Sequence, residues 1–370
     1  MGLAQSCYGS HAGNLRLLSF PSGKRMMKME PRNALLDRRE FTIGATLGLS
    51  LTAANAVSAL SSASAFAAAT PAPSSEGPHT VRFPDGTIVP ALGQGSWHLA
   101  QGRHPEALEE EALRTGLSLG MTLIDTAQIY SEGHSEELIS RVIAGQRDRV
   151  FLVSKVHPDH VTREGIARAC DGSLARLGTD HLDLYLLHWR SPDADLSAIV
   201  ATFETLRAAG KIRAWGVSNF KVSDMEDLFS VPDGHRCATN QVRYSLDDRR
   251  FERDLLPWCE QRGLPVMAYS PLGGDGGSLV RDPALARIGA AHDCSAAVIA
   301  LAWAIRSGNV IAIPESGSPV HVKENAVALS LTLTPQEVQT LDAMYPIKPG
   351  DVMRSLLDRG KGWLRSFRRD

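Results

Sequence analysis

The chain lacks a strong charge of either sign, and it lacks long apolar runs. It has 370 residues, of which 43% are hydrophobic, and its formal net charge is -2. Nucleic-acid binding requires a basic face, so this composition gives no support for a nucleic-acid partner. No apolar run has the length and strength of a membrane-spanning helix. The composition is typical of a globular protein with one large domain or two small ones.

Cysteine motifs are also missing. The five cysteines are Cys7, Cys170, Cys237, Cys259 and Cys294, and they form no C-x-x-C pair and have no metal-ligand spacing. We therefore expect free, mostly buried thiols and no metal site. Cys237 begins a predicted strand and is expected to be reduced and buried, and a disulfide between Cys237 and Cys259 would contradict this.

Residues 1–67 have the pattern of an export signal. Arg38-Arg39 precede Glu40-Phe41, and a weakly apolar run spans residues 44–60. This pattern resembles a twin-arginine signal. It predicts cleavage after Ala67, a Pro/Ser linker over 68–79, and an exported, periplasmic protein that meets the twin-arginine machinery and has no membrane attachment after cleavage. The alternatives are a disordered Ala/Ser-rich tail, or a start placed too early and a cytoplasmic protein.

From residue 80 onward, short strands and amphipathic helices alternate. Residues 80–83 and 87–89 flank Pro84-Asp85-Gly86 and predict a hairpin. Eight strands are predicted near 91–94, 121–125, 150–155, 182–187, 212–217, 237–241, 265–269 and 310–313. Eight helices are predicted near 105–119, 132–144, 162–176, 195–208, 221–229, 251–262, 295–306 and 319–328.

Eight strand–helix pairs over roughly 230 residues are typical of an α/β fold of the (β/α)8 TIM barrel type. We predict this barrel over residues 80–345, with the hairpin before it and a C-terminal loop after a last helix at 334–344. The alternative, a doubly wound open sheet, lacks its usual G-x-G-x-x-G after the first strand. The basic tail over 346–370 is interpreted as a solvated face or as a loop over the barrel mouth.

Four polar residues lie at or just beyond the ends of three predicted strands. They are Asp125, Tyr130, Lys155 and His188, and a barrel places its chemistry at the carboxyl ends of its strands. Free tyrosine is a weak acid at neutral pH, and a nearby ammonium lowers its pKa. We therefore expect Lys155 to lower the pKa of Tyr130, Asp125 to balance Lys155, and His188 to orient a substrate carbonyl. Together they would protonate an oxygen while another group attacks the carbon.

Several further motifs make the chain resemble the aldo-keto reductases over residues 80–345. They are Gly95-Ser96-Trp97, Ile124-Asp125-Thr126-Ala127 with Tyr130, Lys155, Leu187-His188-Trp189, Gly216-Val217-Ser218-Asn219-Phe220, Asn240-Gln241, Tyr269-Ser270-Pro271-Leu272-Gly273, and Ile313-Pro314 through Glu324-Asn325. The resemblance implies a (β/α)8 barrel that binds a reduced nicotinamide cofactor, with Tyr130 as the general acid. It also implies a monomer.

The resemblance assigns cofactor contacts residue by residue. Ser218, Asn219 and Gln241 match the side chains that hold the nicotinamide carboxamide, an amide that needs uncharged donors and acceptors. Tyr269 matches the ring that stacks on the nicotinamide. The remaining matches are Ser270 and Leu272 in the pyrophosphate loop, Ser316 after the last strand, and Glu324 and Asn325 at the adenine.

One position departs from the family pattern. Where the family usually has Lys before Ser316, with Arg five residues after that Ser, this chain has Glu315 and His321. The missing cations would grip the 2'-phosphate of NADPH, which a carboxylate repels. Glu315 could instead accept hydrogen bonds from a ribose hydroxyl, as acidic residues do in NAD sites. NADP(H) is thus the family default, NAD(H) or dual use is a second hypothesis, and Lys323 would compensate if it turned inward.

The predicted function is hydride transfer from NAD(P)H to an aldehyde or ketone, which gives an alcohol. Trp97 and Trp189 would form an aromatic wall that suits a small or medium carbonyl compound, although both could equally be rim packing. A nicotinamide-binding sensory or auxiliary subunit with little turnover is the alternative, but such a binder needs no acid chemistry. A metal-dependent barrel hydrolase would need a cluster of His and carboxylate ligands, which is not evident.

Overall fold

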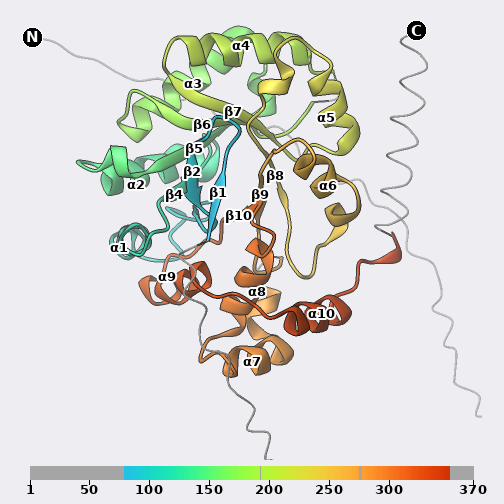
Figure 1. Ribbon diagram of the computed structural model, residues 1–370. Coiled ribbons are helices and arrows are strands. Elements are labelled where there is room, and N and C mark those ends of the chain that lie inside the picture. The colour runs from blue at the N-terminus through green and yellow to red at the C-terminus, as the bar shows by residue number, and fades with distance from the viewer. Residues whose placement is uncertain (1–78, 192, 275–276, 351–370) are drawn as a thin grey trace, which may run out of the picture. The chain divides into compact units, whose positions relative to one another are not determined.

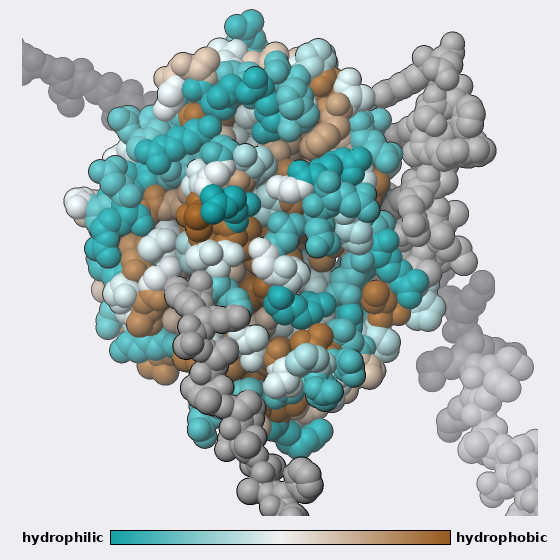
Figure 2. All heavy atoms as spheres, viewed as in Figure 1, coloured by the Kyte–Doolittle hydropathy of each residue, from teal (hydrophilic) through white to brown (hydrophobic). Residues whose placement is uncertain are grey.

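The computed structural model describes residues 79–191, 193–274 and 277–350 (Figure 1). The predicted leader over 1–67, all of the linker except residue 79, and residues 351–370 of the predicted tail lie outside the described residues. None of the helices in the described ranges has the length and apolar character needed to cross a membrane. On the face seen in Figure 2, hydrophobic residues are scattered between hydrophilic ones.

The centre of the fold is one parallel sheet of eight strands in the order β10-β9-β8-β7-β6-β5-β4-β3. The strands are β3 (Gln94–Gly95), β4 (Leu123–Asp125), β5 (Phe151–Val156), β6 (Leu182–Leu187), β7 (Ile212–Ser218), β8 (Asn240–Arg243), β9 (Val266–Tyr269) and β10 (Val310–Ala312). The sheet curls until its edges meet, where parallel bridges join Leu92 to Ala312 and Gly95 to Glu315. The predicted α/β fold with eight parallel strands is confirmed, and the meeting edges are consistent with a (β/α)8 barrel.

The apolar strands explain why the sheet is covered on both faces. All six residues of β6 are buried. Leu184 and Leu186 belong to one hydrophobic cluster, and Tyr185 and Leu187 belong to another, because successive side chains point to opposite faces. A parallel sheet with both faces buried reads as a continuous apolar run in the sequence, and this is the pattern that predicted it.

The helices surround the strands (Figure 1). They are α1 (Glu106–Ser118), α2 (His134–Ile143), α3 (Arg163–Leu177), α4 (Leu196–Ala208), α5 (Val222–Phe229), α6 (Leu255–Glu260), α7 (Pro283–Ala290), α8 (Ala296–Ile305), α9 (Pro319–Ala326) and α10 (Pro335–Met344). Local signals set several boundaries. Thr162 caps α3 by accepting from the Gly165 N–H, and Thr334 and Glu337 form a capping box at α10.

Two helices differ from the sequence-based expectation. The helix α7 was not predicted, although Asp282-Pro283 is a start signal: Asp282 accepts from two backbone N–H groups, and Pro283 occupies the first turn. The helix predicted over 251–262 is shorter. A 3₁₀ turn over Arg250–Arg253 comes first, and α6 begins only after Asp254, whose backbone is not helical.

A hairpin precedes the sheet. Strands β1 (Thr80–Arg82) and β2 (Ile88–Pro90) pair antiparallel. Phe83 stacks on Phe151 at the start of β5, with ring centroids 5.3 Å apart. The hairpin therefore packs at the amino ends of the strands and leaves the carboxyl ends free for a site.

Candidate active site

One cavity of about 780 Å³ lies at the carboxyl ends of the strands. Fifteen of the sixteen predicted site residues line it: Trp97, Asp125, Tyr130, His188, Trp189, Ser218, Asn219, Gln241, Tyr269, Ser270, Leu272, Glu315, Ser316, Glu324 and Asn325. Lys155 is the exception, because its side chain is fully buried behind the cavity wall. The sequence motifs, which are up to 228 positions apart between Trp97 and Asn325, thus meet in one place.

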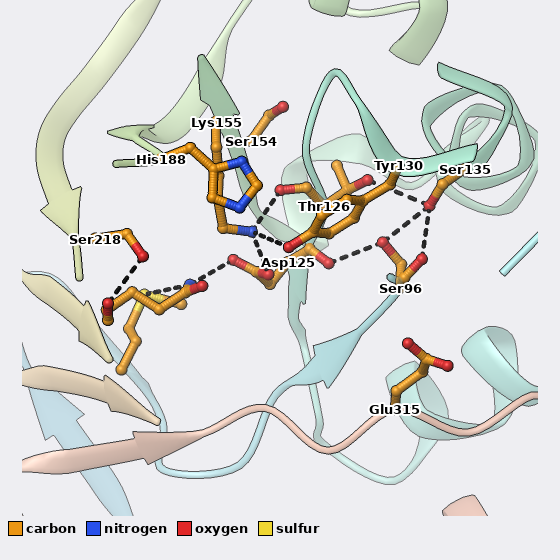
Figure 3. Close-up of polar contacts among 12 residues, drawn as sticks. Ser96, Asp125, Thr126, Tyr130, Ser135, Ser154, Lys155, His188, Ser218 and Glu315 are labelled. Atoms are coloured by element: carbon orange, nitrogen blue, oxygen red, sulfur yellow. Dashed lines mark hydrogen bonds and ion pairs between the residues drawn. The ribbon is translucent and has the colours of Figure 1, made fainter. Parts of the chain in front are cut away.

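Lys155 joins the polar groups at the buried end of this cavity through its ammonium (Figure 3). Its Nζ donates to Asp125 Oδ2 at 2.6 Å and to the Thr126 carbonyl at 2.8 Å, and it lies 3.2 Å from the Tyr130 hydroxyl. Strand register produces this arrangement. Asp125 pairs with Val153 on β5, two positions before Lys155, so both side chains point to the same face.

The ionic states follow from these contacts. Burial disfavours the charge on Lys155, but the Asp125 carboxylate and the Tyr130 hydroxyl together outweigh it, so the pKa of Lys155 is raised and the ammonium is retained. Lys155 acts to lower the pKa of Tyr130, as expected, but the net pKa of Tyr130 is raised. Burial raises the pKa of Tyr130, and the Asp125 charge adds to the rise, so together they outweigh Lys155. Tyr130 is therefore a protonated phenol beside a cation.

Both the side chain and the backbone carbonyl of Asp125 accept hydrogen bonds. Gln241 Nε2 donates to its Oδ1 at 2.7 Å, and the Ser96 hydroxyl donates to its backbone carbonyl at 2.9 Å. Ser135 at the start of α2 donates in turn to the Ser96 hydroxyl at 2.9 Å. These serines were not predicted as site residues, although Ser96 belongs to one of the quoted motifs. Their buried hydroxyls fasten β3 and α2 to the end of β4.

A second buried network fixes the other side of β5. Ser154, next to Lys155, donates to Glu136 Oε1 at 2.6 Å. Arg176 of α3 donates to Glu136 Oε2 at 2.7 Å. Glu136 is fully buried, and a buried carboxylate needs such partners. This network joins α2 and α3 to the strand that carries Lys155, and sequence reasoning gave no signal for it.

His188 faces the same cavity as Tyr130. The two rings are 5.7 Å apart in an edge-on arrangement, and His188 stacks on Trp189 at 3.8 Å. Burial, reinforced by the positive charge of Lys155, lowers the pKa of His188 to about 2. Its Nδ1 is buried without a hydrogen-bond partner among the described residues. The imidazole is therefore neutral.

Strained backbone is concentrated around the cavity. Asn219 and Ser270, which line it, have φ of 63° and 50°. Ser131 and Glu132, directly after Tyr130, have φ of 49° and 56°. Such left-handed conformations are uncommon for residues with a side chain and cluster at functional sites. The turn after Tyr130 also favours glycine at position 133, because Gly133 has φ of 99°, and a Cβ there would lie 2.7 Å from Arg176 Cδ.

Several of the predicted cofactor residues form a connected polar row in the lining of the cavity. The Ser218 hydroxyl donates to the Gln241 carbonyl at 2.8 Å, and Asn219 Nδ2 donates to the His188 carbonyl at 3.2 Å. The Tyr269 hydroxyl donates to Asn219 Oδ1 at 2.9 Å. The Ser295 hydroxyl lines the cavity and is unpartnered among the described residues. Uncharged donors and acceptors with a spare hydroxyl fit a nicotinamide dinucleotide, whose amide and sugar groups need such contacts.

Glu315 lies at the outer end of the cavity and is turned toward the loop after β3. Its Oε2 accepts from the His98 backbone N–H at 2.8 Å, and its Oε1 lies 3.0 Å from His98 Nδ1. His321 lines the cavity, but Lys323 does not. The condition under which Lys323 would compensate is therefore not met, because its side chain is exposed to solvent. His98 and Arg103 also line the cavity.

The four cysteines within the described ranges, Cys170, Cys237, Cys259 and Cys294, are free thiols. Cys237 is buried, as expected, and it forms no disulfide with Cys259. No set of three or more His, Cys, Asp or Glu side chains in the described part of the chain is arranged to hold a metal ion.

A curled sheet of eight parallel strands, with a buried Lys–Asp pair against a tyrosine at its carboxyl end, defines a barrel-type oxidoreductase. Residues 91–346 match the family model described as the Aldo/keto reductase family, and the chain belongs to that family. It is an NAD(P)H-dependent reductase of this class.

Individual relatives agree with this assignment. The chain is 45% identical to methylglyoxal reductase YeaE of Escherichia coli over 273 residues, which cover 73% of this chain and 96% of that protein. It is 46% identical to an aldo/keto reductase of Klebsiella pneumoniae solved with NADP and acetate, with a TM-score of 0.70 over 74% of this chain and 97% of that one. A second structure from Klebsiella pneumoniae, in complex with NADPH, matches equally well.

Proposed function

We propose that the chain reduces an aldehyde or ketone to an alcohol, with Tyr130 as the proton donor. The observation that carries this proposal is the Tyr130 hydroxyl, which lies 3.2 Å from a buried ammonium at the wall of the cavity. A bound reduced nicotinamide supplies the hydride that forms the new C–H bond. The Tyr130 O–H bond breaks, its proton forms the new O–H bond, and a phenolate remains until solvent reprotonates it.

The neighbours of Tyr130 have separate roles in this proposal. Lys155 stabilises the phenolate that forms, since an ammonium at hydrogen-bond distance favours the charged form. Asp125 keeps Lys155 charged and in place. The raised pKa of Tyr130 keeps its proton available until a carbonyl oxygen accepts it.

His188 orients the carbonyl in this proposal. Because its pKa is lowered to about 2, it acts as a neutral hydrogen-bond donor and does not compete with Tyr130 as an acid. The unpartnered Nδ1 leaves its tautomer free to be set by the bound carbonyl compound.

We infer that the cofactor is held by the polar row of Ser218, Asn219 and Gln241 together with Tyr269. NADP(H) is favoured because the two Klebsiella pneumoniae structures hold NADP and NADPH. Glu315 supports use of NAD(H) as well, because its carboxylate lies where the family carries a cation. The exposed Trp97 and Trp189 suit a small or medium carbonyl compound, and methylglyoxal is the first candidate because YeaE is named for its reduction.

The test is reduction of methylglyoxal by the purified full chain, followed by the loss of NADPH or NADH absorbance, in wild type and Tyr130→Phe. We expect Tyr130→Phe to lower kcat by roughly 10²- to 10⁴-fold, the usual contribution of a general acid, and to leave cofactor affinity within about threefold. Tyr345→Phe is the matched control, because Tyr345 lies outside the cavity lining. A Tyr130→Phe enzyme with wild-type kcat would overturn the assignment of the proton donor.

A further inference from the structure

The cavity that receives a dinucleotide is poor in positive charge. Its acidic lining residues are Asp125, Glu315 and Glu324, and its lining also includes three histidines, His98, His188 and His321. Arg103 is the one lysine or arginine among the described residues that line it. A cofactor with a 2'-phosphate adds negative charge at the end where Glu315 already supplies a carboxylate, so a cation is needed there.

The loop that carries Arg103 contacts the segment after β10 at two places. Both carboxylate oxygens of Glu315 contact His98, one through the backbone N–H at 2.8 Å and the other through Nδ1 at 3.0 Å. Farther along the loop, His104 packs so closely on Gly317 that an added Cβ there would lie 2.6 Å from its ring. Arg103 therefore lies at the Glu315–Gly317 end of the cavity, next to the residue that contacts Gly317.

The side chain of Arg103 is available for a ligand. It is exposed, and it makes no hydrogen bond or ion pair with any other described residue. By contrast, Arg114 of α1 forms an ion pair with Glu110. An arginine that lines a cavity without a protein partner presents a planar set of donors that matches a phosphate.

We propose that Arg103 binds the 2'-phosphate of NADPH and replaces the cation that is missing at Glu315. The Glu315–His98 contact is then a positioning contact, because it anchors the loop that brings Arg103 to this end of the cavity. This inference rests on the proposed function only in its choice of cofactor. It predicts that the phosphate contact comes from the loop after β3 and not from the segment after β10.

The experiment measures binding and needs no turnover. NADPH, NADH, adenosine 2'-monophosphate and adenosine 5'-monophosphate are titrated into the full chain by calorimetry, for wild type, Arg103→Gln and Arg103→Lys. We expect Arg103→Gln to weaken NADPH and the 2'-monophosphate by roughly 10- to 100-fold, the range for hydrogen bonds to a charged group. NADH and the 5'-monophosphate should change by less than about threefold, and Arg103→Lys should retain part of the affinity because it keeps the charge.

Arg82→Gln is the matched control, because Arg82 lies in the exposed hairpin away from the cavity. Equal weakening of NADPH and NADH would overturn the proposal, since Arg103 would then act on the shared pyrophosphate or on the fold. Unchanged NADPH affinity in Arg103→Gln would also overturn it. Failure of the wild type to bind either dinucleotide would instead contradict the proposed function, so the two failures are distinguishable.

Discussion

The inner and outer ends of the cavity are built in different ways. At the inner end, Asp125 and Lys155 are buried and directly bonded, and they come from adjacent strands. At the outer end, Trp97 and Trp189 are 50% and 41% exposed, and they come from loops. The inner end is fixed by strand register, and the outer end depends on contacts between loops such as that of His98 with Glu315.

This difference separates the residues that carry out the reaction from those that select the cofactor and the carbonyl compound. A buried ion pair at strand ends tolerates little movement, which suits a proton transfer that is common to all substrates. Exposed loop residues change without disturbing the sheet. The inner end therefore sets the reaction, and the outer end sets the cofactor and the carbonyl compound.

The largest effect is expected at the inner end, from Lys155→Met. It leaves Asp125 buried without its cation, so the free energy of unfolding should fall by roughly 3–5 kcal/mol, as for other broken buried pairs. Urea unfolding measures this loss. Asp125→Asn combined with Lys155→Met removes both charges and should regain stability but not activity. If Lys155→Met were as stable as wild type, the Asp125–Lys155 pair would not contribute to the free energy of unfolding.

The next effect is a pH dependence that is due to His188. Its pKa is lowered from 6.5 to about 2 in the folded chain, so between these values only the unfolded chain takes up the proton. The stability that is present above pH 6.5 is then lost as the pH falls, by up to about 1.4 kcal/mol per pH unit. We expect this slope to be smaller by about that amount in His188→Gln. Urea unfolding at several pH values between about 6 and 4 measures the slope for each protein. Equal slopes in wild type and His188→Gln would contradict the conclusion that His188 is buried and neutral.

The smallest effect is expected at the outer end, from Glu315→Gln. The amide oxygen can still accept from the His98 backbone N–H, so the loop stays anchored while the negative charge is lost. NADPH should bind about fivefold more tightly, which corresponds to roughly 1 kcal/mol of relieved repulsion. NADH should be unchanged, which makes it the internal control in parallel titrations. A stronger effect on NADH would mean that Glu315 contacts the ribose.

Much of the site could be predicted because chemistry-bearing residues follow apolar strands. Asp125, Lys155 and His188 close three such strands, and parallel strands bring their carboxyl ends together. The sign of the pKa shift of Tyr130 could not be predicted, because it depends on how deeply the phenol is buried. The orientation of Lys323, which is exposed and outside the cavity lining, could not be predicted because the sequence does not fix which face of α9 meets the cavity.

The sequence by itself determined the alternation of strands and helices, the family, and the residues at the inner end. Hydrophobic periodicity and strand order are local properties, and they place strand-end residues at one edge of the sheet. Only the tertiary structure decided the long-range contacts of irregular segments: the Glu315–His98 contact across 217 positions, the Ser154–Glu136–Arg176 network, and the place of Arg103 in the cavity. Loops have no repeating pattern, so their contacts depend on the packing of the whole chain.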